Sequence, residues 1–497
     1  MSIGRVRRLR FLGSALFGIF TLVVLALSSE SRIDDAWATR VSAVLVIVSC
    51  AIVLYTVIKQ KSVFNGYTLV LGTFLLAYPL SALTHLALVQ GASNGFYDMA
   101  ILDRSTQAHH VYFALLLVFL GQVSLWWGLS PGRSMPKSTR IRVMPSKTLY
   151  VLGAMFTIVG IYGTYMLARE SASLVSYLTT VERNRYLGNG MARYGFTSAW
   201  LFWGITFGLT AFLGSRFGKT HGTTSLFLVI AGAFCILFNM YWTGGRAEDI
   251  LIALPLLMVV RKLNRRLLWP ATAVIVAGVI LVIVLQTTAR TKFARGGFNS
   301  QVVDVFDWQM GRYSSLGLIF DMVDEDGFAL GSTLLNGPAM TFNAPATLME
   351  IPFKIPEPLP ITALVGRYLY SNTDRNGVVP GTMAELYYNF GAIGVILGFY
   401  AIGKLARYCI GLSEDCNSIS VYLLAIYAIV LICTWMIPMT ATLALYFLAT
   451  RGLPVLLLCV IDYRRGNPHP SVATYRPIDA KGPLFAVTQR RRNVNLA

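Results

Sequence analysis

Long apolar runs recur along the whole chain, and short polar or basic stretches separate them. The runs lie near residues 11–28, 41–58, 67–89, 111–129, 149–168, 197–213, 224–243, 246–260, 268–287, 381–403, 419–437 and 441–461. A helix needs about 20 predominantly apolar residues to cross a hydrocarbon core about 30 Å thick. The pattern therefore predicts an all-α, polytopic integral membrane protein with about 12 transmembrane helices, embedded in a lipid bilayer.

Composition agrees with this pattern, since hydrophobic residues make up 55% of the chain and charged residues only 13%. The net charge of +19 first suggests a nucleic-acid partner. However, the basic clusters all fall on one side of the predicted spans: 5–10, 59–61, 133–147, 216–219, 261–266, 404–407 and the tail 462–497. The positive-inside rule makes that side cytoplasmic and places both termini there. No basic stripe interleaved with aromatic residues is present, so no nucleic-acid partner is expected.

The first apolar run follows a basic N-terminus and could be a signal peptide, but its length favours an uncleaved span. The chain then divides into four parts: a transmembrane bundle of about nine spans (1–287) with a smaller outer loop (169–195), a large outer loop (288–380), the last spans (381–461), and a basic tail expected to be disordered (462–497). Helical spacing within 302–322 predicts an interfacial helix in the large loop. The absence of an internal repeat argues weakly against a transporter.

Ionisable residues stand at membrane depth in the stretch 241–249. A span of about 17 residues, counted back from the basic cluster Arg261–Arg266, begins near Gly244. Arg246, Glu248 and Asp249 then lie at the outer edge of the hydrocarbon, where such groups usually face a cavity or the bundle interior. The alternative is an interfacial arginine in a short turn, with two acids that favour a helix N-terminus.

A second candidate stretch begins where the large loop returns to the membrane. Glu385 is a candidate base there, and Tyr388 and Asn389 follow it on the same helix face, where they could orient a substrate. The alternative is structural, because Thr382-x-x-Glu385 is also a capping-box pattern. Three later glycines predict close helix packing: Gly391, Gly394 and Gly398.

Further arginines complete the candidate set. Arg451 interrupts the last span, and Gly452 and Pro454 could open the helix after it; a misplaced boundary or a snorkelling side chain is the alternative. The large loop adds five arginines: Arg290, Arg295, Arg312, Arg367 and Arg375. Arginine binds phosphate in a bidentate manner, so the group suggests a site for an anionic lipid head group.

Other chemistries lack their motifs. The chain contains no G-x-x-x-x-G-K-[ST] loop, so nucleotide hydrolysis is not expected. It has no His or Cys pairs at metal-ligand spacing, so no metal is expected, and no other cofactor is expected either. The pair His109-His110 is interpreted as incidental.

The chain resembles the bacterial O-antigen polymerases of the Wzy family. The resemblance covers the whole architecture and, locally, Gly244-Gly245-Arg246, Glu385-Leu386-Tyr387-Tyr388-Asn389-Phe390-Gly391 and Arg451-Gly452. It implies a metal-independent glycosyltransferase with a GT-C-like architecture in the bacterial inner membrane, its site facing the periplasm. Its partners would be undecaprenyl-pyrophosphate-linked oligosaccharides and a membrane protein that regulates chain length.

On this hypothesis Arg246 and Arg451 grip the pyrophosphate and Glu385 is the base. Asp249, Asp304 and Asp321 remain alternatives for the base. Two other functions remain open. O-antigen ligases resemble the same family but use a histidine in the large outer loop, and residues 288–380 contain none. A flippase or transporter of lipid-linked sugars would bind the same pyrophosphate without chemistry.

Overall fold

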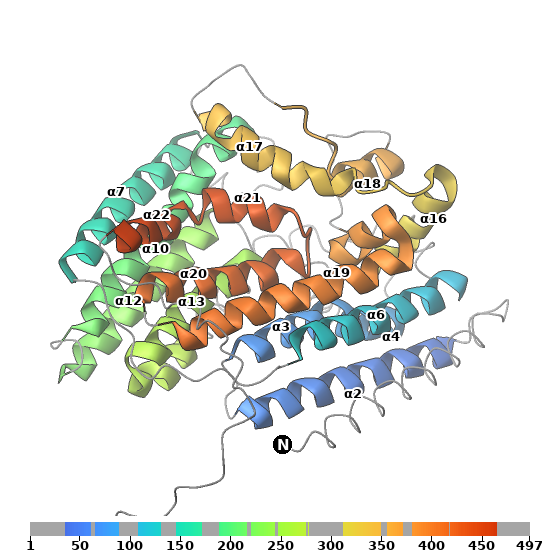
Figure 1. The fold of residues 1–497 in the computed structure, drawn as a ribbon, viewed down its shortest axis with the longest axis horizontal. Coiled ribbons are helices and arrows are strands. Elements are labelled where there is room, and N and C mark those ends of the chain that lie inside the picture. Colours follow the sequence, from blue (N-terminus) through green and yellow to red (C-terminus); the bar gives the residue numbers. More distant parts are fainter. Residues whose placement is uncertain are drawn as a thin grey trace, which may run out of the picture.

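The structure is a computed structural model, and the regular elements that it describes are helices (Figure 1). It describes residues 35–60, 65–88, 108–130, 146–170, 188–215, 220–243, 247–274 with 277, 312–348, 355–370, 380–416 and 418–464. Seven helices are long and apolar enough to cross a membrane: Trp37–Ile58, Gly66–Leu86, His110–Leu129, Lys147–Met166, Thr197–Gly214, Gly381–Glu414 and Ile419–Met436. A bent helix pair, Leu443–Thr450 with Leu453–Tyr463, gives up to eight. The all-helical, multi-pass membrane architecture is thus confirmed.

The number of twelve spans stays a prediction. The expected span 11–28 and most of 268–287 lie outside the described residues. The expected spans 224–243 and 246–260 correspond to the helices α12 (Gly222–Thr243) and α13 (Ala247–Leu263). α13 has only 17 residues and contains Pro255, so by itself it reaches only the lower limit of a membrane span.

Two hydrophobic clusters divide the described helices. The first joins α2 (Asp35–Gln60), α3 (Gly66–Leu75), α4 (Ser81–Leu88), α6 (Ala108–Leu129), α16 (Leu316–Asp326) and α19 (Gly381–Asp415). The second joins α7 (Ser146–Glu170), α10 (Gly188–Gly214), α13, α20 (Ile419–Leu431), α21 (Leu443–Thr450) and α22 (Leu453–Arg464). α20 and the π-helical turn η6 (Ile432–Met436) contribute residues to both clusters, so they lie between them. In Figure 1, α2 runs along the lower edge and α7 lies at the upper left.

Glycines allow the closest helix contacts. A Cβ atom at Gly160 of α7 would lie 2.3 Å from the Leu201 backbone nitrogen of α10, and one at Gly128 of α6 would lie 2.4 Å from the Tyr400 carbonyl oxygen of α19. Small residues bring helix backbones together in membranes, where van der Waals contact rather than water exclusion drives association. These contacts fix α7 against α10 and α6 against α19.

α19 is two helices joined at a sharp turn. Gly391 has φ 64° and ψ −157°, a conformation that side chains other than glycine strongly disfavour. A Cβ atom at Gly398 would lie 2.4 Å from the Leu386 side chain, although a straight helix would separate these residues by about 18 Å. Residues 381–390, here called the re-entrant helix, therefore fold back onto the start of the long helix that follows (Figure 1). The predicted close packing at Gly394 and Gly398 is present, but their neighbour is the same element.

Residues 288–380, predicted to form the large outer loop, contribute α16, the 3₁₀ turn η5 (Thr333–Leu335), α17 (Asn336–Leu348) and α18 (Ile361–Tyr370). The helix expected on the membrane surface over 302–322 begins, within the described residues, only at Leu316. Leu316, Ile319 and Phe320 are buried in the first cluster, because α16 packs against α6 and α19. The position of this helix at the membrane surface stays a prediction. α17 packs against α21.

Candidate functional site

The re-entrant helix begins deep in the bundle, near the middle of its neighbours. Gly121 of α6 packs against Met383 and lies about 16 Å from the His110 end and about 12 Å from the Leu129 end of its span. The Tyr78 hydroxyl accepts a hydrogen bond from the Met383 amide at 3.1 Å. Tyr78 lies about 18 Å and about 12 Å from the two ends of the span Gly66–Leu86. Glu385 follows Met383 by two residues, so it is held at membrane depth as well.

Tyr78 is placed there by an interrupted helix. The π-helical turn η1 (Leu76–Leu80) contains Pro79, which has no amide hydrogen to donate. The Tyr78 hydroxyl donates a hydrogen bond of 2.8 Å to the Ile437 carbonyl, in addition to accepting the one from Met383. Tyr78 therefore ties three elements together at one point. Sequence reasoning did not select it; Pro79 inside an apolar run was the available signal.

The chain between η6 and α21 is not helical, and it lies opposite the start of the re-entrant helix. We call residues 437–442 the 437–442 turn. One carboxylate oxygen of Glu385 accepts a hydrogen bond of 3.1 Å from the Ala441 amide in this turn. Glu385 is 1% exposed. The Thr382 hydroxyl makes no cap bond to Glu385, so the capping-box interpretation is wrong: the carboxylate reaches across to another element.

Arg312, which precedes α16, enters the same region. Its side chain is buried; Nε donates a hydrogen bond to the Pro438 carbonyl and Nη2 donates one of 3.3 Å to Met439 Sδ. Its backbone amide donates to the Ala77 carbonyl at 3.0 Å. Because lipid offers no hydrogen bonds, backbone groups freed by a broken helix must find partners within the protein. Arg312 and Glu385 supply such partners at two points of the 437–442 turn.

The structure thus brings two of the predicted residues, Arg312 and Glu385, to one short segment of chain. Two further hydroxyls belong to the same segments: that of Thr382, on the re-entrant helix, and that of Thr440, in the 437–442 turn. Both are buried, and among the described residues neither has a hydrogen-bond partner. A buried hydroxyl without a partner is unfavourable by about 1–3 kcal/mol, so each is suited to a water molecule or a substrate hydroxyl.

Asn389 and Tyr388 have structural partners. The Asn389 carboxamide accepts a hydrogen bond from the Gly331 amide at 2.8 Å and donates to Thr333 Oγ1 and to the Glu385 carbonyl, each at 2.7 Å. The Tyr388 carbonyl accepts from the Ala329 amide at 3.0 Å. These bonds hold the loop after α16 onto the re-entrant helix. The Asn389 side chain thus makes its hydrogen bonds to other residues of the protein.

Arg451 lies at the opposite end of α21 from the 437–442 turn. It follows α21, which is about 12 Å long and separates it from the 437–442 turn. Its guanidinium lies 4.3 Å from the centre of the Phe447 ring, and its carbonyl accepts a hydrogen bond of 2.8 Å from Trp203 Nε1. The 60° bend between α21 and α22 occurs here, as Gly452 and Pro454 predicted.

The remaining candidates are placed only in part. Arg367 is exposed on α18. Glu248 and Asp249 begin α13, but their side chains lie outside the described residues. Four arginines lie outside them altogether: Arg246, Arg290, Arg295 and Arg375. A shared pocket of Arg246, Glu385 and Arg451 therefore stays a prediction.

Asp321, an alternative for the base, belongs to a separate pair. Its Oδ1 lies 3.4 Å from Nε2 of His110, which is buried at the start of the α6 span. His110, interpreted from the sequence as incidental, thus has an acidic partner. Nearby, the Tyr313 hydroxyl donates a hydrogen bond of 3.3 Å to the Val111 carbonyl, and burial raises the pKa of this hydroxyl above the ordinary tyrosine range. These contacts fix α16 against α6.

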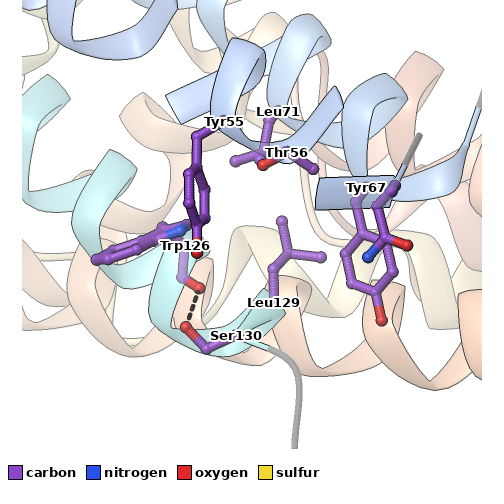
Figure 2. A pocket seen from close by; sticks show the side chains of 8 residues that line it. Tyr55, Thr56, Tyr67, Leu71, Trp126, Leu129 and Ser130 are labelled. Carbon is purple, nitrogen blue, oxygen red and sulfur yellow. Dashed lines mark hydrogen bonds between the residues drawn. The ribbon is translucent and has the colours of Figure 1, made fainter. Parts of the chain in front are cut away.

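A small pocket, partly open to the outside, lies at the opposite end of α6 (Figure 2). It is lined by Tyr55, Thr56, Gln60, Tyr67, Leu71, Trp126, Leu129 and Ser130. Figure 2 shows the aromatic rings of Tyr55 and Trp126 together on one side of it. None of its lining residues is charged, and it adjoins Leu129 rather than Gly121, so it is separate from the Glu385 region.

Among the described residues, no three His, Cys, Asp or Glu side chains are grouped so as to hold a metal ion. Comparison with known protein families, with curated proteins and with solved structures finds no match to this chain.

Proposed function

We propose that this protein is a membrane glycosyltransferase that polymerises oligosaccharide repeat units linked to undecaprenyl pyrophosphate. It would act at the periplasmic face of the bacterial inner membrane, with both termini in the cytoplasm, and build O-antigen or a related surface polysaccharide. The observation that carries the proposal is a buried carboxyl, Glu385, held at membrane depth by a re-entrant helix beside an irregular backbone turn. Ionisable residues at such depth are unfavourable and are usually kept for function.

The proposed reaction needs few protein groups. An acceptor hydroxyl of one repeat unit attacks the anomeric carbon of the glycan on the other carrier, and the bond from that carbon to the pyrophosphate oxygen breaks. Glu385 accepts the proton of the attacking hydroxyl, and the leaving pyrophosphate retains the electron pair. The Thr382 and Thr440 hydroxyls, which lack partners among the described residues, are suited to hold sugar hydroxyls near Glu385.

Arginine side chains would stabilise the leaving pyrophosphate. Preorganised cationic groups in a site that excludes water lower the barrier where charge develops. We assign this role to Arg246 and Arg451, with help from Arg290, Arg295, Arg367 and Arg375. Arg312 has a different part in the proposal: it holds the Pro438 carbonyl and so fixes the shape of the 437–442 turn against which Glu385 is placed.

The direct test uses the purified protein in lipid nanodiscs with lipid-linked repeat units and no nucleotide. A ladder of products that differ by one repeat unit supports the proposal. Substrate that remains unextended, while crossing the membrane of sealed vesicles, would instead indicate transport. Transfer of the glycan to a lipid A core acceptor would indicate a ligase.

Transport is the second candidate because one observation favours it. Transporters bind substrates near the bilayer midplane, at discontinuous helices whose irregular backbone lines the site. The re-entrant helix and the 437–442 turn have these features. A transporter does not need a proton acceptor, so the two functions differ in their response to replacement of the Glu385 carboxylate.

A further inference from the structure

The loop that follows α16 presents large apolar side chains at the surface. Phe328, Leu330 and Leu335 are exposed, and Leu330 is 80% exposed. Phe390, at the end of the re-entrant helix, lies next to this loop and is exposed as well. We call these four side chains the apolar tip.

The loop backbone is shaped to project this tip. Gly327, Leu330 and Gly331 have φ values of 78°, 48° and 91°, all in the region that favours glycine. Leucine rarely adopts a positive φ, and such a conformation persists only where the surroundings impose it. Turn bonds from the Ser332 amide to the Ala329 carbonyl, at 3.0 Å, and from Leu334 to Gly331, at 3.1 Å, close the loop. Leu330 is therefore held outward on a preformed loop.

The tip is fastened to the turn of α19. The Gly331 amide donates to Asn389, and the Ala329 amide donates to the Tyr388 carbonyl. A Cβ atom at Gly331 would lie 3.2 Å from the Phe390 ring, and one at Gly391 would lie 3.3 Å from the Phe328 ring. The loop and the turn at Gly391 thus form one apolar surface.

This surface continues the lipid-facing side of a membrane span. Ile393 and Leu397, one helical turn apart on α19, are both exposed, and Ile393 comes two residues after Gly391. On the other side of the tip, the exposed acidic residues Asp324, Glu325 and Asp326 end α16. Carboxylates remain in water whereas leucine and phenylalanine partition into hydrocarbon, so the boundary falls within this loop.

We propose that the apolar tip inserts into the hydrocarbon of the bilayer leaflet at the Gly391 end of α19. The lipid then covers Phe328, Leu330, Leu335 and Phe390, and the inserted loop anchors the re-entrant helix through Asn389. The occupant is the acyl-chain layer itself, because the tip is continuous with the Ile393 and Leu397 face.

A fluorescent probe tests this placement without relying on activity. The exposed native cysteines, Cys50 and Cys235, are first replaced by alanine. Leu330→Cys is then labelled with a polarity-sensitive nitrobenzoxadiazole dye in the full-length protein, reconstituted in phosphatidylcholine nanodiscs. We expect a blue-shifted emission, strong quenching by lipids with a nitroxide near the head-group end of the acyl chain, and weak quenching by iodide in the buffer.

Asp326→Cys is the matched control, four residues away on the same segment, and should give the opposite quenching pattern. Leu335→Cys is a second probe of the tip in case the label at position 330 perturbs the loop. Iodide quenching at positions 330 and 335 as strong as at position 326, without quenching by lipid nitroxides, would overturn the proposal. That result would mean that water, not hydrocarbon, covers the tip.

Discussion

The α7–α10 hairpin and the contact of the re-entrant helix with the 437–442 turn are two ways of packing helices in one membrane protein. In the hairpin, two uninterrupted helices approach through glycines: Gly160 lies against Leu201, and Gly204 lies against Thr157. In the second region, helices break, and Tyr78, Arg312 and Glu385 bind the exposed backbone. The hairpin needs small residues, whereas the second region needs polar and charged ones.

The difference indicates where function lies. In lipid, an unbroken helix satisfies its own backbone, so contact between two such helices requires only shape. A broken helix needs added hydrogen-bond partners, and buried ionisable partners are unfavourable. A short loop at the membrane surface would have joined η6 to α21 without them. The region that retains Arg312 and Glu385 is therefore the better candidate for a substrate site.

The largest expected effect follows from Glu385→Gln. Glutamine can still accept the Ala441 hydrogen bond through its side-chain oxygen, so the fold should persist, but it cannot accept the proton of an acceptor hydroxyl. A positioned base contributes about 10²- to 10⁴-fold in rate, so we expect repeat-unit extension to slow by that factor. The measurement is the rate of ladder formation in nanodiscs.

Glu414→Gln is the matched control, because Glu414 lies on the same element, far from the 437–442 turn. It should extend chains at the normal rate. Normal extension by Glu385→Gln would remove Glu385 from the chemistry. If the unsubstituted protein and Glu385→Gln both move lipid-linked repeat units across the membrane at the same rate, and neither extends them, the protein is a transporter.

Arg312→Ala should cause the largest loss of stability. It leaves the Pro438 carbonyl without its donor and empties a buried volume. A buried carbonyl without its donor is unfavourable by about 1–3 kcal/mol, and the emptied volume adds a further loss of packing. Unfolding in mixed micelles with increasing dodecyl sulfate measures the change. Arg367→Ala, at an exposed position on α18, should alter stability by less than about 0.5 kcal/mol. Equal losses in both variants would contradict the role of Arg312.

The hairpin offers a matched pair of glycines on α10. A Cβ atom at Gly204 would lie 2.4 Å from the Thr157 backbone nitrogen, whereas one at Gly208 would meet nothing within 4 Å. Backbone cannot move aside easily, so Gly204→Ala should destabilise by about 2–3 kcal/mol. Gly208→Ala should be neutral or stabilising by up to about 1 kcal/mol, because alanine favours helices. Similar effects at both positions in the same micelle assay would refute glycine-mediated packing.

The positions of the spans were predictable because the bilayer dictates them. The expected runs 41–58 and 149–168 correspond to Trp37–Ile58 and Lys147–Met166, since length and apolar composition are properties of each segment alone. The fold-back at Gly391 was not predictable in this way. Residues 381–403 form one continuous apolar run, and the re-entrant helix is distinguished from a straight one by the backbone at Gly391 and by the contact between Leu386 and Gly398.

The candidate site was predictable to a similar degree. Glu385 stands out because it lies where the predicted outer loop returns to the membrane, whereas Arg312 is only one of five loop arginines suited to bind phosphate. The structure brings both residues to the 437–442 turn. Tyr78 did not stand out, because tyrosine is common near membrane spans and its partners come from distant segments. The capping-box pattern at Thr382 was misleading for the same reason: a tertiary contact with Ala441 replaced the local one.

The smallest expected effect concerns the turn at Gly391, which creates the re-entrant helix and has no counterpart in the α7–α10 hairpin. Gly391→Ala places a side chain at φ 64° and ψ −157°, with the Phe328 ring 3.3 Å from the new Cβ atom. Such a conformation is unfavourable by about 1–2 kcal/mol for alanine, so the re-entrant helix should be held less firmly. We expect a stability loss of that size and slower extension, because Glu385 would be positioned less well. Gly411→Ala, on the straight part of α19 with nothing within 4 Å, should show neither change. If Gly391→Ala behaved like Gly411→Ala, α19 would be a straight helix, and Glu385 would belong with ordinary packing residues such as those of the hairpin.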